Sequence, residues 1–158
     1  MLYILIGILT VVLDFVTKKL AVAYLAGQES FPLIEGVFQL TYVENRGVAF
    51  GLFQDQRWFF VLLSILILIL LTWLYYKIKT RSIWMKLGAA LVYAGAIGNL
   101  IDRVVQGYVV DFLDFCLIGF PVFNVADIAV CVGVVMLAIH YIFYMEKASD
   151  NQKSKGAE

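Results

Sequence analysis

The chain has 158 residues, of which 63% are apolar and only 15% are charged, and its formal net charge is zero. Soluble domains average about 45–50% apolar and about 25% charged residues, so a water-soluble fold of this length cannot bury such an apolar excess. The composition therefore predicts an integral membrane protein. The balanced charge also disfavours a nucleic-acid partner, which requires a basic patch on the protein.

The first apolar stretch predicts a helix over residues 2–25, because a membrane span needs about 20 mostly apolar residues. It carries Asp14, Lys18 and Lys19 after a run without charged side chains. A cleaved signal peptide has its positive charges before the apolar run, so we expect this helix to be retained. Asp14 and Lys18 are four residues apart, a spacing that favours a self-neutralising pair on one helix face.

The next segment, about residues 27–56, contains a short stretch rich in β-branched and aromatic side chains at residues 37–43. Asn45-Arg46-Gly47 follows as a turn signal. We therefore expect a small antiparallel β-sheet in this first outer loop. A lone hairpin is marginally stable in water, so the sheet should rest on the membrane or the helices. The apolar contacts would come from Phe31, Phe38, Phe50 and Phe53.

Three further apolar stretches predict spans over residues 58–76, 84–104 and 123–144. The second of these is rich in glycine and alanine, which let helices approach closely in lipid, so we expect it at the centre of the bundle. The expected architecture is an α-helical integral membrane protein, with a four-transmembrane-helix bundle and an outer β-sheet cradle. Residues 1–146 would form one membrane domain, followed by a polar tail over residues 147–158.

Lysine and arginine are unevenly distributed among the connections between these helices. The first and third connections contain three, whereas the middle connection and the tail contain seven: Lys77, Lys79, Arg81, Lys86, Lys147, Lys153 and Lys155. Cytoplasmic loops of membrane proteins carry the excess of positive charge. We therefore expect a multi-pass membrane protein with both termini in the cytoplasm.

Ionisable side chains in the predicted spans are few, and each costs at least about 2.5–3.5 kcal/mol at membrane depth. Asp127 lies in an otherwise uncharged helix, three residues after Asn124. Further polar residues lie at the outer end of the third span and in the connection after it: Asn99, Asp102, Arg103, Asp111 and Asp114. The predicted topology brings several of these carboxylates together near the outer leaflet.

Two carboxylates that share a low-dielectric site cannot both ionise cheaply, so one of them retains a proton at neutral pH. One can then act as a base toward water while the other donates a proton to a carbonyl oxygen. This aspartyl peptidase chemistry needs no metal, other cofactor or cysteine. It also fits a chain with a single histidine, His140, and with no metal-binding cysteine pattern.

Structural interpretations of the same residues remain open at this point. Asn124 is a suitable helix N-cap, and Asp127 in the first turn would be favoured by the helix dipole. Two other functions are also open. A small proton-coupled transporter or channel would use the aspartates as relay sites, and a non-enzymatic assembly subunit would use the glycine- and alanine-rich helix as a partner surface.

Five blocks, taken together and in this order, resemble the bacterial lipoprotein signal peptidases (signal peptidase II). They are residues 14–18 (DFVTK), 45–51 (NRGVAFG), 95–103 (GAIGNLIDR), 109–112 (VVDF) and 123–127 (FNVAD). The resemblance extends from about residue 10 to about residue 135, which is nearly the whole predicted membrane body.

The resemblance implies an intramembrane aspartyl endopeptidase that removes signal peptides from diacylglyceryl-modified prolipoproteins, cleaving before the lipidated cysteine. It places the catalytic pair on Asp111 and Asp127, and so favours Asp111 over Asp114. The site-shaping positions fall on Asn99, Asp102, Arg103 and Asn124, the substrate-positioning ones on Asn45 and Gly47, and a supporting structural motif on Asp14 and Lys18. It also implies no cofactor, contact with membrane lipids and inhibition by globomycin-type peptides, and we expect a monomer.

Overall fold

The computed structural model describes residues 1–47, 56–77 and 82–155, with the backbone alone described for residues 144–155. Its elements in chain order are α1 (Leu2–Leu25), β1 (Phe31–Ile34), β2 (Phe38–Asn45), α2 (Arg57–Lys77), α3 (Ile83–Val105), β3 (Val109–Asp114), the short 3-10 helix η2 (Cys116–Ile118) and α4 (Val125–Lys155). Motif residues 48–51 and the expected contacts of Phe50 and Phe53 lie outside the described residues.

Three of the helices are long and apolar enough to cross a membrane: α2, α3 and the part of α4 that ends at Phe143. Their outer surfaces are apolar, and Leu62, Leu66 and Ile69 of α2 are each more than 60% exposed. Side chains of this kind are stable on an outer surface when lipid rather than water covers them. The prediction of a mostly helical membrane protein is therefore confirmed, with three candidate spans.

Helix α3 lies at the centre of the bundle and contacts α1, α2 and α4. Its contact with α4 depends on glycine, because a Cβ atom at Gly88 would lie 2.8 Å from the carbonyl oxygen of Gly133. A Cβ atom at Gly133 would in turn lie 2.6 Å from the carbonyl oxygen of Gly88. Small residues thus bring the two backbones together, and α3 has the central place expected from its composition.

The three strands form one antiparallel sheet in the order β1-β2-β3. The β1–β2 hairpin comes from the expected outer segment, whereas β3 comes from the connection between α3 and α4. The register pairs Asn45 with Val109 and Gln39 with Asp114. The expectation of a sheet within residues 27–56 was therefore incomplete, because pairing between segments so distant in sequence leaves no local pattern.

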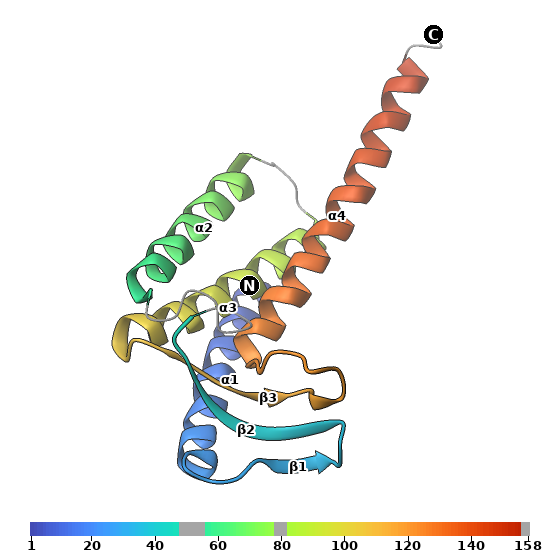
Figure 1. Ribbon diagram of the computed structural model, residues 1–158. Coiled ribbons are helices and arrows are strands. Elements are labelled where there is room, and N and C mark those ends of the chain that lie inside the picture. The colour runs from blue at the N-terminus through green and yellow to red at the C-terminus, as the bar shows by residue number, and fades with distance from the viewer. Residues whose placement is uncertain (48–55, 78–81, 156–158) are drawn as a thin grey trace.

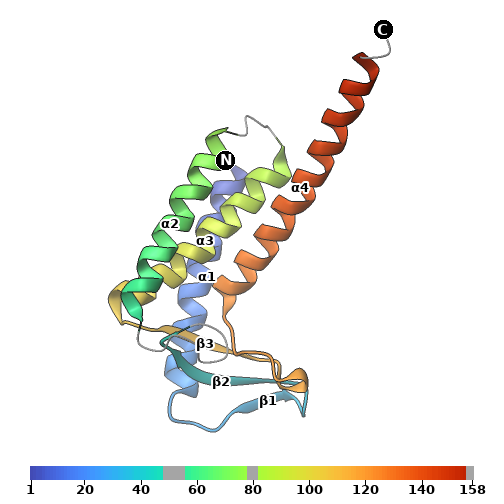
Figure 2. The same ribbon diagram turned by 45° about the horizontal axis from the view of Figure 1, so that its top comes forward.

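The sheet lies at one end of the helical bundle, and both chain termini lie away from it (Figures 1 and 2). A small apolar cluster of Ala21, Val110 and Phe112 joins the end of α1 to the sheet. The sheet therefore rests on the bundle, and β3 is held next to the helices. At the opposite end α4 continues to Lys155, so most of the polar tail has a helical backbone.

Candidate active site

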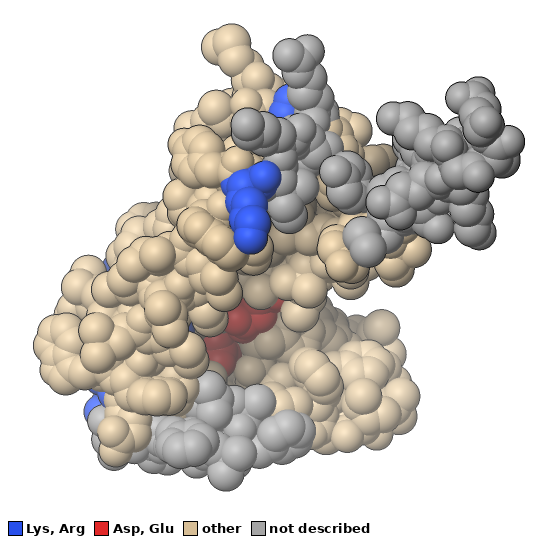
Figure 3. Space-filling view, turned by 90° about the horizontal axis from the view of Figure 1, so that it is seen from above, with Lys and Arg blue, Asp and Glu red and all other residues tan. Residues whose placement is uncertain are grey.

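Polar side chains from four elements meet at the end of the bundle that carries the sheet. Within the described part of the chain, the buried polar and charged residues are Asp14, Lys18, Asp111 and Asn124. They belong to α1, to β3 and to the residue that precedes α4, and Asn99 of α3 connects them. Seen from above, acidic side chains lie at the bottom of a hollow in the surface (Figure 3).

Asp111 is held on the buried strand β3 and is only 2% exposed. Asn45 donates a hydrogen bond from Nδ2 to Asp111 Oδ2 at 2.8 Å, and Asn124 donates from Nδ2 to Oδ1 at 2.6 Å. Burial raises the pKa of Asp111 to about 6, and the charge of Asp127 acts in the same direction, whereas the hydrogen bonds from the two asparagines oppose the rise. Asp111 is thus a carboxyl group that retains a proton more readily than usual.

Asp127 lies in the first turn of α4 and accepts two hydrogen bonds. Asn99 donates from Nδ2 to Asp127 Oδ1 at 2.8 Å, and the backbone N–H of Asn124 donates to Oδ2 at 3.1 Å. The Asn124 side chain accepts from the backbone N–H of Asp127 at 3.0 Å. This reciprocal pair is a capping box that begins the helix, so Asp127 has a structural contact as well as one toward α3.

The side chain of Asn124 links the two carboxylates. It is fully buried, with its Oδ1 occupied by the backbone of Asp127 and its Nδ2 directed at Asp111. The same Nδ2 lies 3.3 Å from Asn99 Oδ1. One amide therefore fixes the position of strand β3 relative to the start of α4, and with it the placement of Asp111 relative to Asp127.

Lys18 is the centre of a second buried network. Its Nζ lies 2.8 Å from Asp14 Oδ2, 2.8 Å from Asp102 Oδ2 and 2.8 Å from Asn99 Oδ1. Because Lys18 donates to the carbonyl oxygen of the Asn99 amide, the amide nitrogen is left to face Asp127. The pair of Asp14 and Lys18 expected from the sequence is present, and Lys18 also connects α1 to α3 through Asp102 and Asn99.

Asp14 also reaches the start of α4, where its Oδ1 accepts a hydrogen bond from the backbone N–H of Ala126 at 2.9 Å. The first N–H groups of a helix have no partner within the helix, so this carboxylate satisfies one of them. Sequence analysis missed this contact. Its only signal was the pair of glycines at 95 and 98, which allow α1 and α4 to approach α3 closely.

Arg103 and Gly47 lie near the two carboxylates and contact residues that hold them. The Arg103 side chain donates to the backbone carbonyl of Asn99 at 3.4 Å and lies over the ring of Phe60, 5.5 Å from its centroid. Within the described residues it forms no ion pair with either aspartate. The backbone N–H of Gly47 donates to Asn45 Oδ1 at 3.0 Å, which turns the Asn45 amide nitrogen toward Asp111.

Asp114 lies apart from this cluster. Residues three apart on a strand point to opposite faces of the sheet, and Asp114 accepts a hydrogen bond from Gln39 Nε2 at 2.6 Å across the β2–β3 pair. Of the two aspartates of β3, Asp111 is therefore the one that Asn124 links to Asp127. Among the described residues, no group of three or more histidine, cysteine, aspartate or glutamate side chains is placed to hold a metal ion.

Comparison with known proteins gives a family to which this arrangement belongs. The family described as signal peptidase (SPase) II matches residues 6–143, a range that contains every residue of the two networks. The chain belongs to the signal peptidase II family. The resemblance noted from the five sequence blocks is thereby confirmed, and the chain is a bacterial membrane peptidase by family.

Individual relatives match this chain over most of their own length. A lipoprotein signal peptidase of Clostridioides difficile (strain 630) is 46% identical over 150 residues, which cover 94% of this chain and 99% of the relative. One from Brevibacillus brevis is 44% identical, with 87% and 92% covered. A solved structure described as a bacterial membrane enzyme is 35% identical to this chain, with a TM-score of 0.81. The alignment covers 92% of this chain and 90% of the chain in that structure.

Proposed function

We propose that this protein is an aspartyl endopeptidase that removes signal peptides from diacylglyceryl-modified lipoprotein precursors, cleaving before the lipidated cysteine. The observation that carries the proposal is the fully buried Asn124, which hydrogen-bonds to both Asp111 and the first turn containing Asp127. It holds two carboxylates from different elements in one low-dielectric site. Such a pair can divide the roles of acid and base.

In the proposed mechanism Asp111 is the carboxyl group that carries the proton, which its burial and raised pKa support. Asp127 accepts a proton from a water molecule, whose oxygen attacks the scissile carbonyl carbon. Protonated Asp111 donates its proton to the carbonyl oxygen, which gives a neutral tetrahedral intermediate. When this intermediate collapses, the C–N bond breaks and the proton held by Asp127 passes to the leaving amine. Asp111 recovers its proton from the collapsing hydroxyl group.

The membrane arrangement in the proposal has α1 as a fourth span. Helix α1 has 24 residues, its apolar side chains are exposed, and its charged residues Asp14 and Lys18 are buried and paired. Pairing removes most of the cost of placing these charges in lipid. The sheet and the carboxylate pair then lie near the outer leaflet of the inner membrane, with both termini cytoplasmic, so that water reaches the site from outside.

The proposed substrate enters sideways from the bilayer. Its signal helix would lie beside the bundle, with the acyl chains of the modified cysteine left in lipid and the scissile bond between Asp111 and Asp127. The remaining site residues would act by position: Asn99, Asp102, Arg103 and Asn124 hold the pair, and Asn45 and Gly47 position the substrate. The enzyme would act as a monomer without a cofactor, and globomycin-type peptides would inhibit it.

The distribution of buried polar groups supports a peptidase rather than a proton-coupled transporter. A conduit needs polar residues along the whole depth of the membrane. Among the described residues of this chain, the buried polar and charged side chains all belong to the networks around Lys18 and Asn124. Helix α2 carries buried Phe60 and Val61 and no buried polar side chain in its described range.

A cleavage assay tests the proposal. The full chain in nanodiscs is mixed with a diacylglyceryl-modified prolipoprotein, alongside the variants Asp111→Asn, Asp127→Asn and Asp114→Asn. A general acid or base contributes about 10²–10⁴-fold to rate, so the first two variants should lose at least about 10²-fold. Asp114→Asn is the matched control, because it neutralises a carboxylate of the same strand that accepts a hydrogen bond from Gln39 rather than from Asn124, and it should cleave like the parent.

The outcomes separate the residue assignment from the function itself. Full activity of a folded Asp111→Asn or Asp127→Asn protein would remove that residue from the catalytic pair. Loss of activity in Asp114→Asn alone would transfer the role of Asp111 to Asp114. Absence of cleavage by the folded parent chain would overturn the peptidase proposal.

A further inference from the structure

A pocket of about 390 Å³ lies between α1, α2 and α3, separate from the carboxylate site. Its volume is within the range of small-molecule pockets, about 300–1,000 Å³. The pocket is open to the outside of the bundle. Helix α2 makes its main contact with α3, so the space between α2 and α1 is left for another molecule.

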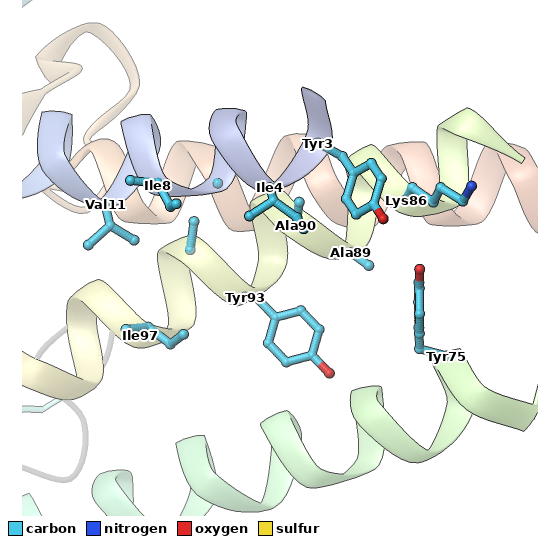
Figure 4. Close-up of a pocket in the computed structure, with 12 residues that line it drawn as sticks. Tyr3, Ile4, Ile8, Val11, Tyr75, Lys86, Ala89, Ala90, Tyr93 and Ile97 are labelled. Atoms are coloured by element: carbon cyan, nitrogen blue, oxygen red, sulfur yellow. The ribbon is translucent and has the colours of Figure 1, made fainter. Parts of the chain in front are cut away.

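The two ends of this pocket differ in chemistry (Figure 4). Ile8, Val11 and Ile97 line one end, whereas the hydroxyl groups of Tyr3 and Tyr75 and the amine of Lys86 lie at the other. The polar end is also the end of the helices: Tyr3 lies at the start of α1, Tyr75 near the end of α2 and Lys86 in the first turns of α3. Tyrosine and lysine at helix ends are typical of the headgroup depth of a bilayer.

The polar end of the pocket has three donors, and no acceptor for them is found among the described residues. Lys86 is half-buried, and its recorded contact is the ring of Tyr3, 5.7 Å from Nζ to the centroid. In the part of the chain that the structure describes, no carboxylate pairs with Lys86, and neither phenol forms a hydrogen bond. In the proposed orientation this end of the helices lies at the cytoplasmic leaflet, whose anionic lipids attract lysine side chains, so an anionic group from outside the protein fits here.

We propose that this pocket binds one anionic phospholipid. The phosphate accepts from Lys86 and from the hydroxyl groups of Tyr3 and Tyr75, and one acyl chain lies along Ile8, Val11 and Ile97. A phosphate has the several acceptor oxygens that three convergent donors require. A lipid with a cationic headgroup, or the positively charged start of a signal peptide, would be repelled by Lys86. This lipid fills the space between α1 and α2, and its binding does not depend on the proposed peptidase activity.

Native mass spectrometry of the full chain in detergent tests this proposal, with dioleoyl phosphatidylglycerol and dioleoyl phosphatidylcholine as probes. Both probes offer a phosphate to the three donors, but phosphatidylcholine also brings a positive trimethylammonium group, which Lys86 repels, so phosphatidylglycerol should bind about tenfold more tightly or better. Lys86→Gln should lose this preference, and Lys86→Arg should retain it. Lys77→Gln is the matched control, because Lys77 lies at the same end of the bundle but outside the pocket, over the ring of Trp73.

A pocket-filling variant and a chain-free competitor test the acyl-chain part of the site. Ala90→Phe should weaken binding of the anionic lipid, since Ala90 lines the pocket one helical turn after Lys86 and a phenyl ring there would occupy its volume. Glycerol 3-phosphate at the same concentration should not displace the lipid. The proposal would be overturned if the parent bound the two lipids equally or if Lys86→Gln kept the preference for the anionic lipid. It would also be overturned if Lys77→Gln lost the preference as fully as Lys86→Gln, or if glycerol 3-phosphate displaced the lipid.

Discussion

At the scale of single residues, the amide side chains of Asn99 and Asn124 decide where the two carboxylates lie. Each amide has one donor end and one acceptor end, and the neighbouring groups leave each a single orientation. Lys18 occupies the oxygen of Asn99, and the backbone of Asp127 occupies the oxygen of Asn124. The two nitrogens therefore face Asp127 and Asp111, which keeps the pair in place without a direct contact from Arg103.

The raised pKa of Asp111 predicts a pH dependence of stability. Burial raises this pKa from 3.8 to about 6, so between these values the folded chain binds more protons than the unfolded chain. The free energy of unfolding therefore falls as pH rises through this range. At about 1.4 kcal/mol per pKa unit, the fall is roughly 2–3 kcal/mol. Asp111→Asn should lack this contribution.

Thermal unfolding of the parent and of Asp111→Asn, measured in the same detergent between pH 3.5 and pH 7, tests this prediction. The stability difference between the two proteins should change in favour of the variant up to about pH 6 and then stay constant. A difference that is independent of pH would contradict the raised pKa of Asp111.

Lys18 should be among the residues on which stability most depends. It neutralises Asp14 and Asp102 in a buried position, and removing one partner of a buried ion pair costs about 3–5 kcal/mol. Lys18→Met should therefore lower the free energy of unfolding by about this amount. Lys19→Met is the control, because Lys19 is exposed on the next position of α1, and it should change stability by less than about 0.5 kcal/mol. Urea unfolding in detergent measures both, and equal effects would contradict the network.

At the scale of elements, the contact between α3 and α4 positions the start of α4. A Cβ atom at Gly95 would overlap the carbonyl oxygen of Ala126 and would lie 2.7 Å from Val130 Cγ2. Overpacking typically costs about 1–3 kcal/mol, so Gly95→Ala should destabilise the protein by that amount. It should also lower cleavage, because Asp127 follows Ala126 directly in the first turn of α4.

Gly7→Ala is the matched control for this contact. A Cβ atom at Gly7 would lie 3.4 Å from its nearest neighbour, the carbonyl oxygen of Ala90. Alanine is favoured over glycine within a helix by about 0.5–1 kcal/mol, so this variant should be as stable as the parent or more so. Thermal unfolding and cleavage are measured for both variants. A tolerated Gly95→Ala would show that α4 can move away without loss.

At the scale of the whole molecule, the proposed orientation places the sheet outside the membrane and the α2–α3 connection in the cytoplasm. In a chain with Cys116 and Cys131 replaced by serine, Glu35→Cys should react with a membrane-impermeant maleimide in intact spheroplasts. Glu35 lies between the exposed strand β1 and β2. Lys77→Cys, at the end of α2 that lies away from the sheet, should react with the maleimide only after the membrane is permeabilised. The reverse pattern would invert the topology.

The sequence by itself determined the helices, the membrane class and the family. Helix positions followed from long apolar stretches, since spanning a bilayer requires length and apolarity along a continuous segment. The central place of α3 followed from glycines and alanines that are adjacent in sequence. The candidate residues Asp111 and Asp127 followed from five motifs in order. Each of these features depends on side chains that lie close together along the chain.

Only the tertiary structure decided how the site is assembled. Strand β3 pairs with β2 across more than 60 residues, Lys18 reaches Asp102 from another helix, and Asp14 caps α4 from α1. The motif match favoured Asp111 over Asp114, and the sheet supplies the physical reason, because their positions on β3 place them on opposite faces. Long-range contacts of this kind depend on the packing of distant segments, and no local periodicity or spacing in the sequence encodes them.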